Sequence, residues 1–383
     1  MGGLRGRIWM RTTISVDNKD VLAAVQSFLR KLLDSGLVDA LYIPLESADG
    51  TLIPSLVVDP VLLEDANPLA PVMPINGARA VSALTNKGDS FRLGAVLRPC
   101  EQRALIELVK LQQASLEKLV LISFDCPGTY ETIDYQAIRQ AGKFDLNQYL
   151  SAAREGDEPA LEQVGLRNAC QMCVLPVPEN ADITLEIFGS RLDQGIPVTM
   201  NGELCEKLRY LPEEPPAGDA RQVILDRKIQ DRRQVRDRQL SGIQEKITAE
   251  GGIAGLFAAC IRCHNCMTVC PICYCKTCLF KTAAFDHPPE HYLRLAQRKG
   301  ATRMLGDTLL FHLTRLNHMS ASCVSCGMCT SACPADIPVG AIFSAIGAKV
   351  QATFGYVPGR SVTETLPLIT FQANEWTEVG EAK

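Results

Sequence analysis

Apolar positions in the first half of the chain follow the period of a helix in one stretch and mark short buried strands in others. A helix is predicted at residues 18–35, and Gly36 is expected to end it. Its apolar face consists of Val21, Leu22, Val25, Phe28, Leu29, Leu32 and Leu33. Strands are predicted at 37–45, 51–59, 91–97 and 119–124, a helix at 101–114, and a loop at the proline-rich residues 60–78. This alternation predicts an α/β domain with a mixed sheet.

The second half has helical periodicity instead. Helices are predicted at 289–297 and 302–316, and after Pro338 an apolar stripe continues through Val339, Ile342, Phe343 and Ile346. Residues 221–240 carry seven Lys or Arg against three Asp, which predicts a solvated helix or a docking strip for an acidic partner. An acidic loop is expected at 155–163, and a linker at 212–219. The predicted divisions are a first domain (1–210), a linker with the charged helix (211–250), a mainly α module (251–352) and a C-terminal arm (353–383).

Two cysteine runs lie in the mainly α module. Cys260, Cys263, Cys266 and Cys270 are followed by Pro271, and the same spacing recurs in Cys323, Cys326, Cys329, Cys333 and Pro334. This is the bacterial ferredoxin pattern, in which the fourth cysteine of each run ligates the other cluster. We therefore assign Cys260, Cys263, Cys266 and Cys333 to one [4Fe–4S] cluster, and Cys323, Cys326, Cys329 and Cys270 to the second. Structural zinc is the alternative, although it requires neither the proline nor two full repeats.

Composition narrows the class of protein. The chain has 383 residues, a formal net charge of −4 and 46% hydrophobic residues, so nothing global indicates nucleic acid as a partner. Sixteen cysteines in metal-type clusters indicate a reducing cytoplasm. No apolar run approaches the length of a membrane span.

Four further cysteines lie where an α/β sheet gathers ligands. Cys100 and Cys126 each follow a predicted strand, at the carboxyl ends that bind ligands in open sheets. Cys170 and Cys173 form a C-x2-C pair further along the chain. Together they supply enough thiolates for a third [4Fe–4S] cluster. Alternatively, Cys100 and Cys126 are small buried hydrophobic residues.

Three motifs carry a resemblance to a known family. They are Leu97-Arg98-Pro99-Cys100-Glu101-x-Arg103-Ala104, Phe124-Asp125-Cys126-Pro127-Gly128-Thr129, and Arg167-x2-Cys170-x2-Cys173 with Ala181-Asp182-Ile183. With them the chain resembles the beta subunits of coenzyme F420-dependent hydrogenases and dehydrogenases. The appended ferredoxin is similar to that of F420-dependent formate dehydrogenase beta subunits. The resemblance implies FAD and a [4Fe–4S] cluster in the first domain. The module also resembles the helical ferredoxins of succinate dehydrogenase and heterodisulfide reductase.

Flavin itself leaves little mark in the sequence, which has neither a G-x-G-x-x-G motif nor a Walker loop. Arginine suits a pyrophosphate because its planar fork donates two hydrogen bonds. The candidate flavin-binding residues are Asn76, Arg79, Arg98, Arg103 and Thr129. Three extra cysteines follow the first ferredoxin run and are candidates for packing or for another metal site: Cys273, Cys275 and Cys278. A further cysteine, Cys205, stands alone.

These patterns predict an iron–sulfur flavoprotein subunit of an oxidoreductase complex. It would pass electrons between a soluble carrier, coenzyme F420 or NAD(P), and a partner subunit. The partner would be a formate dehydrogenase, a hydrogenase or a heterodisulfide reductase-like protein. The alternative is a flavin-free relay that joins two larger enzymes. A redox-sensing regulator is disfavoured because no basic recognition helix is present.

Overall fold

The first domain is built on one seven-stranded sheet with the order β1-β7-β6-β5-β4-β2-β3. The computed structural model describes residues 8–86, 91–158, 164–213, 220–249, 251–301 and 304–368. The strands are β1 (Trp9–Ser15), β2 (Ala40–Glu46), β3 (Leu52–Val57), β4 (Leu93–Val96), β5 (Leu119–Phe124), β6 (Ile183–Leu185) and β7 (Gly195–Asn201). Neighbours from β2 through β4 and β5 to β6 are parallel, and β3, β7 and β1 add antiparallel edges. The predicted mixed sheet is confirmed.

Local chemistry explains why the first elements form. Helix α1 (Val21–Asp34) begins where the Asp20 side chain accepts a hydrogen bond from the Ala23 N–H, and it buries one apolar face. Its end is followed by Gly36 at φ +65°, the left-handed conformation that favours glycine. Helix α3 (Pro99–Lys110) begins with proline in its first turn, and the Glu101 side chain accepts from the Arg98 N–H.

Several elements differ from the sequence expectation. The predicted loop at 60–78 contains a short 3₁₀ helix, η1 (Pro60–Asp65), and the predicted helix at 302–316 begins only at Thr308. Elements without a clear signal were missed, among them β1, which finds its partner β7 almost two hundred residues away. In the first domain, the described helices without a prediction are α2 (Ala78–Thr85), α4 (Thr132–Gln140), α5 (Leu146–Arg154), α6 (Asn168–Gln171) and α7 (Gly202–Lys207). Residues 159–163 and 214–219 of the predicted loop and linker lie outside the described residues.

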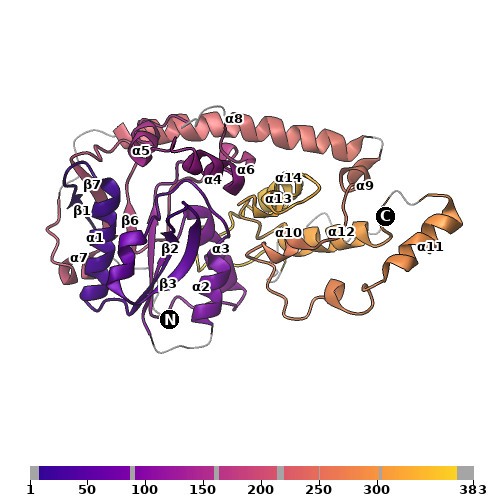
Figure 1. The fold of residues 1–383 in the computed structure, drawn as a ribbon, viewed down its shortest axis with the longest axis horizontal. Coiled ribbons are helices and arrows are strands. Elements are labelled where there is room, and N and C mark those ends of the chain that lie inside the picture. The colour runs from indigo at the N-terminus through magenta and orange to yellow at the C-terminus, as the bar shows by residue number, and fades with distance from the viewer. Residues whose placement is uncertain are drawn as a thin grey trace.

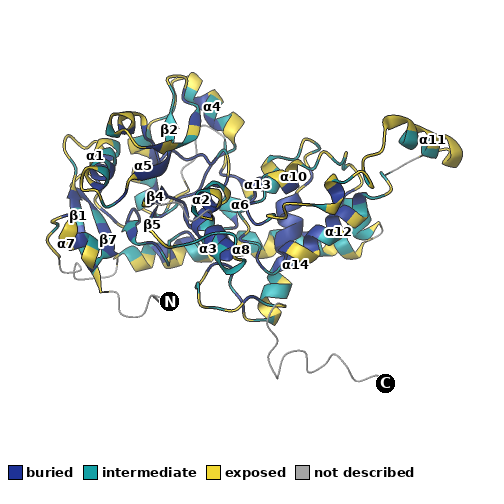
Figure 2. Ribbon diagram, turned by 90° about the horizontal axis from the view of Figure 1, so that it is seen from below, coloured by how far each residue is buried: buried dark blue, intermediate teal, exposed yellow. Residues whose placement is uncertain are grey.

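The charged stretch forms a single long helix, α8 (Ala220–Thr248), which is longer than predicted. Figure 1 shows α8 running along one side of the molecule, over both the sheet domain and the helical module. Beyond it lie α9 (Gly252–Leu256), α10 (Asn265–Thr268), η2 (Leu279–Lys281), α11 (Pro289–Lys299), α12 (Thr308–Met319), α13 (Met328–Ser331) and α14 (Val339–Thr353). Helix α11 projects away from the rest and buries none of its residues (Figure 2).

The two halves share apolar packing. One hydrophobic cluster contains Leu105 of α3, Leu240 of α8, Phe311 of α12 and Phe343 of α14. Burial of such side chains stabilises the junction by about 1.5–3 kcal/mol each. Within the described ranges, no helix combines the length and apolar composition needed to cross a membrane.

Candidate functional site

Four cysteines from three segments of the first domain line one cavity. Cys100 lies in the first turn of α3 and Cys126 follows β5, so both stand at the carboxyl ends of parallel strands. The short helix α6 and the loop after it add the other two. We call this set the first-domain thiol group: Cys100, Cys126, Cys170 and Cys173.

Positive charge and hydrogen-bond donors surround this group. The Arg98 Nη1 donates to Cys126 Sγ at 3.6 Å, and Thr129 Oγ1 lies 3.3 Å from Cys170 Sγ. Burial acts to raise the pKa of Cys170, but Arg167 and Thr129 outweigh it and lower that pKa. Arg98, Arg103, Arg167 and Arg232 all line the same cavity. Buried thiolates need such compensation, so the donor set fits an anionic [4Fe–4S] cluster.

The thiols of the two ferredoxin runs lie in two mixed groups. Burial raises the pKa of Cys266, and nearby Cys260, Cys263 and Cys333 thiols add to the rise. Burial likewise raises the pKa of Cys270 to about 12, with contributions from Cys326 and Cys323. The outer thiol group is therefore Cys260, Cys263, Cys266 and Cys333. The inner thiol group is Cys323, Cys326, Cys329 and Cys270.

The inner thiol group lies next to the first-domain thiol group. Burial and the Glu101 carboxylate raise the pKa of Cys100 well above its usual range, and the Cys326 thiol adds to the rise. Arg167 joins the two halves at this point, because its Nη2 donates to the Cys326 carbonyl at 2.7 Å. The outer thiol group is at the far side, where Cys263 is exposed. The three groups thus follow one another from the first domain to the surface of the helical module.

Of the four remaining cysteines, Cys205, Cys273 and Cys278 have packing contacts. Cys205 is buried and its Sγ donates to the Tyr210 carbonyl at 3.5 Å. Cys278 Sγ lies 3.7 Å from Met267 Sδ, and Cys275 is exposed. In the parts of the chain that the structure describes, no three His, Cys, Asp or Glu side chains stand together as ligands for one metal ion. A cubane is a different case, since each of its four irons takes one thiolate.

The candidate flavin residues are dispersed among these groups. Arg98, Arg103 and Thr129 line the cavity of the first-domain thiol group. Arg79 instead donates from Nη1 to the Thr268 carbonyl at 2.8 Å, in the helical module. Asn76 lies beside the Cys326 thiol and accepts the Ala78 N–H at its Oδ1. The structure therefore does not bring the five candidates to one place.

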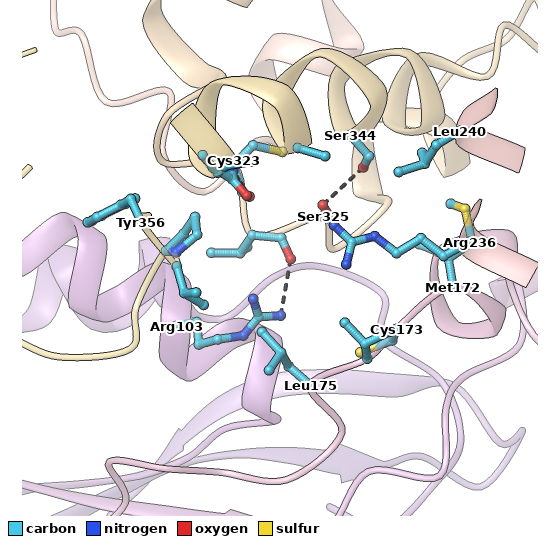
Figure 3. Close-up of a pocket in the computed structure, with 18 residues that line it drawn as sticks. Arg103, Met172, Cys173, Leu175, Arg236, Leu240, Cys323, Ser325, Ser344 and Tyr356 are labelled. Carbon is cyan, nitrogen blue, oxygen red and sulfur yellow. Dashed lines mark hydrogen bonds between the residues drawn. The ribbon is translucent and has the colours of Figure 1, made fainter. Parts of the chain in front are cut away.

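A second cavity of about 300 Å³ is lined by one cysteine of the first-domain thiol group, Cys173, and one of the inner thiol group, Cys323. Cys173 and Arg103 line its first-domain side, and Cys323 and Ser344 line the side of the helical module (Figure 3). Arg103 Nη2 donates across the junction to the Val324 carbonyl at 3.1 Å. Sequence reasoning missed three further lining residues that come from the charged helix and the C-terminal arm: Arg236, Leu240 and Tyr356.

The comparisons with known proteins agree with an iron–sulfur site. Residues 256–337 match a family model described as a 4Fe-4S dicluster domain. The helical module is thus similar to a known class of iron–sulfur domain, as the cysteine spacing predicted.

Relatives extend the similarity to the whole chain. The F420-dependent formate dehydrogenase subunit beta of Methanocaldococcus jannaschii is 27% identical over 380 residues, 90% of this chain and 93% of the relative. The F420-dependent formate dehydrogenase 1 subunit beta of Methanococcus maripaludis is 25% identical over 88% of this chain and 90% of its own. A chain of the F420-reducing [NiFe] hydrogenase complex from Methanosarcina barkeri aligns with a TM-score of 0.43 and 13% identity, covering 63% of this chain and 96% of that one. The resemblance predicted from the motifs is confirmed, and with it the similarity to subunits of oxidoreductases.

Proposed function

We propose that this chain is the iron–sulfur flavoprotein subunit of a cytoplasmic oxidoreductase complex. It would pass electrons between a soluble two-electron carrier, coenzyme F420 or NAD(P), and a partner subunit. The partner would be a formate dehydrogenase, a hydrogenase or a heterodisulfide reductase-like protein. The two relatives are beta subunits of F420-dependent formate dehydrogenases, which favours F420 as the carrier and formate dehydrogenase as the partner.

The spatial order of the three thiol groups is the observation that supports this proposal. Each group has the four thiolates that a [4Fe–4S] cluster needs. The first-domain thiol group adjoins the inner thiol group through Cys100 and Cys326. The outer thiol group then reaches the surface at Cys263. Residues of this chain would thus hold redox sites in order from a buried domain to an exposed end.

The flavin ring would lie in the cavity between Cys173 and Cys323. Its volume of about 300 Å³ is at the lower end of small-molecule sites. It would therefore accept a ring system but not an entire dinucleotide. Bound there, a flavin would exchange two electrons with a hydride carrier and single electrons with its neighbours. The surrounding residues would orient the ring: Arg103 and Arg236 as hydrogen-bond donors, and Met172 and Leu175 as apolar walls.

Metal content gives a first test. We expect about twelve irons per fully loaded chain, four for each thiol group. Iron and sulfide analysis of anaerobically purified protein measures this directly. About eight irons would remove the first-domain cluster from the proposal, whereas replacing Cys205 by alanine should leave the count unchanged.

The position of the first-domain cluster gives a sharper test. Cys173→Ala removes one thiolate from the first-domain thiol group and leaves the other two groups intact. Flavin reduction by the carrier should persist, while reduction of the two ferredoxin clusters through the flavin should become at least about tenfold slower. Stopped-flow absorbance separates the two events. Unchanged reduction of the ferredoxin clusters would place the first-domain cluster off the electron path, with the flavin reducing the inner cluster directly at the Cys323 wall of its cavity.

A flavin-free relay that joins two larger enzymes is the second candidate, since the candidate flavin residues are dispersed. The visible spectrum separates the two proposals, because flavin adds absorption bands that iron–sulfur clusters alone do not have. Heat-released FAD in the supernatant would support the flavoprotein, and its complete absence from freshly purified protein would support the relay.

A further inference from the structure

Arg315 is a buried arginine on α12 that contacts the outer thiol group directly. Its Nη1 donates to Cys266 Sγ at 3.1 Å and its Nη2 to the Cys266 carbonyl at 3.0 Å. The residue is only 4% exposed, and its Nε is buried with no hydrogen-bond partner in the described parts of the chain. A guanidinium placed in this way cannot be solvated by bulk water.

The charge of Arg315 is balanced by thiols of both ferredoxin groups. Among the described residues, no ion pair with a carboxylate involves Arg315. The rings of Phe311 and Phe343 lie 5.5 and 4.8 Å from the guanidinium carbon. Burial acts to lower the pKa of Arg315, but the Cys266, Cys270 and Cys329 thiols outweigh it and raise that pKa. Phe343 belongs to α14, and a Cβ on Gly340 of that helix would lie 3.6 Å from Cys329 Sγ, so the guanidinium bonded to Cys266 also faces the inner thiol group.

We infer that Arg315 raises the reduction potentials of both ferredoxin clusters, and that its hydrogen bond raises the potential of the outer one further. Reduction adds one negative charge to a cluster, and a nearby buried positive charge stabilises the reduced form. Hydrogen bonds to cluster sulfurs act in the same direction. Because one guanidinium acts on both clusters, it would shift their reduction potentials in the same direction. The difference between the two potentials, and with it the free energy of electron transfer between the clusters, would then stay small.

His312, one turn before Arg315, provides a contrast on the same helix. Its Nε2 lies 3.3 Å from Cys260 Sγ, and its ring stacks on Phe257 with centroids 3.7 Å apart. Among the described residues, this contact of His312 is to the outer thiol group, and none joins it to the inner thiol group.

The inference rests on the proposed function only in requiring two clusters in the helical module. It is tested on the purified, fully loaded chain by redox titration with dithionite, followed by electron paramagnetic resonance. No partner or soluble carrier is present. A failure of the proposed carrier or flavin would therefore leave these potentials unaffected, while an iron count that excludes two ferredoxin clusters would count against the proposed function itself.

Three variants separate charge from hydrogen bonding. Arg315→Gln should lower both potentials, with the outer cluster shifted by about 59 mV or more, a tenfold change in its reduced fraction. His312→Gln should shift the outer cluster alone, which also identifies its signal. Arg298→Gln, which removes an exposed arginine of α11, is the control and should shift neither. Iron content and circular dichroism are measured for every variant.

Arg315→Lys keeps the positive charge but loses the planar fork of the guanidinium. This variant tests the role of the charge if Arg315→Gln does not retain iron. The potential of the outer cluster should then fall. The reduced fraction of the inner cluster should stay within about twofold of its wild-type value. An inner potential unmoved by Arg315→Gln, or a fall of both in Arg315→Lys, would overturn the shared role of the charge. Loss of iron from both variants would also overturn it, because Arg315 would then be needed for assembly rather than tuning.

Discussion

Single buried charges show most clearly how the fold constrains this chain. Lys228 lies on α8 with its side chain only 1% exposed. Its Nζ donates to Glu158 Oε1 and to the Gly156 carbonyl, both at 3.3 Å. Burial lowers the pKa of Lys228 to about 8, and the neighbouring Arg232 lowers it further, against the opposing effect of Glu158. The helix that spans the molecule is therefore attached through a cation that is costly to bury.

This cost predicts a pH dependence of stability. Below pH 8 the folded and unfolded chains both hold the Lys228 proton. Between pH 8 and the unfolded pKa of about 10.4 the folded chain has released it and the unfolded chain has not. Stability should therefore rise with pH in this window, by up to about 1.4 kcal/mol per pH unit. Urea denaturation at several pH values, compared between wild type and Lys228→Met, isolates the effect.

The variant should lack this part of the rise, because it has no proton to release. Lys246→Met removes an exposed lysine from the same helix and should behave as the wild type does. If the curve of Lys228→Met runs parallel to that of the wild type from pH 8 to pH 10, Lys228 is not the group responsible.

At the scale of elements, the C-terminal arm is joined to α3 by a buried carboxylate. Glu107 accepts from Tyr356 Oη at 2.5 Å, from the Gly359 N–H at 2.8 Å and from Lys110 Nζ at 3.2 Å. Gly359 has φ +75°, and a Cβ there would lie 2.4 Å from the Arg103 Cα. The backbone of the arm therefore approaches α3 as closely as only glycine permits. Tyr356, Val357 and Pro358 also line the cavity beside Cys173.

Two glycine variants distinguish this close approach from backbone strain alone. Gly359→Ala should destabilise the protein by about 2–4 kcal/mol, since strain and steric overlap add. Gly355→Ala is the matched control: its φ is +57°, but a Cβ there meets nothing within 4 Å, so about 1–2 kcal/mol is expected. Chemical denaturation gives both values. Equal losses in the two variants would show that the contact with Arg103 is unimportant.

At the scale of the whole molecule, cofactor sites and packing follow different boundaries. The apolar cluster of α3, α8, α12 and α14 crosses from the first domain into the helical module. The outer thiol group, in contrast, takes all its ligands from the helical module. We therefore expect stability to be shared between the two halves, and loss of the outer cluster to have local consequences.

Cys266→Ala tests this separation. The variant should lose the outer cluster, which holds about four irons. The rate of electron transfer to a partner should fall at least about tenfold. Flavin should remain bound, because the cavity between Cys173 and Cys323 has no wall from the outer thiol group. Iron analysis and flavin absorbance measure the two quantities on one sample. Release of flavin together with the outer cluster would contradict the separation.

The sequence by itself determined the helical iron–sulfur module, since ligand spacing is local and recurs in two runs. It also determined the strands β2, β3, β4 and β5, because buried strands are short apolar runs with clear ends. Only the tertiary structure decided what depends on long-range pairing. It joined β1 to β7, brought Cys126 beside Cys170, and buried Lys228 and Arg232 on a helix whose composition is that of a solvated one. Such contacts leave no periodic signal, because the partner that makes a polar residue buried lies far away in the chain.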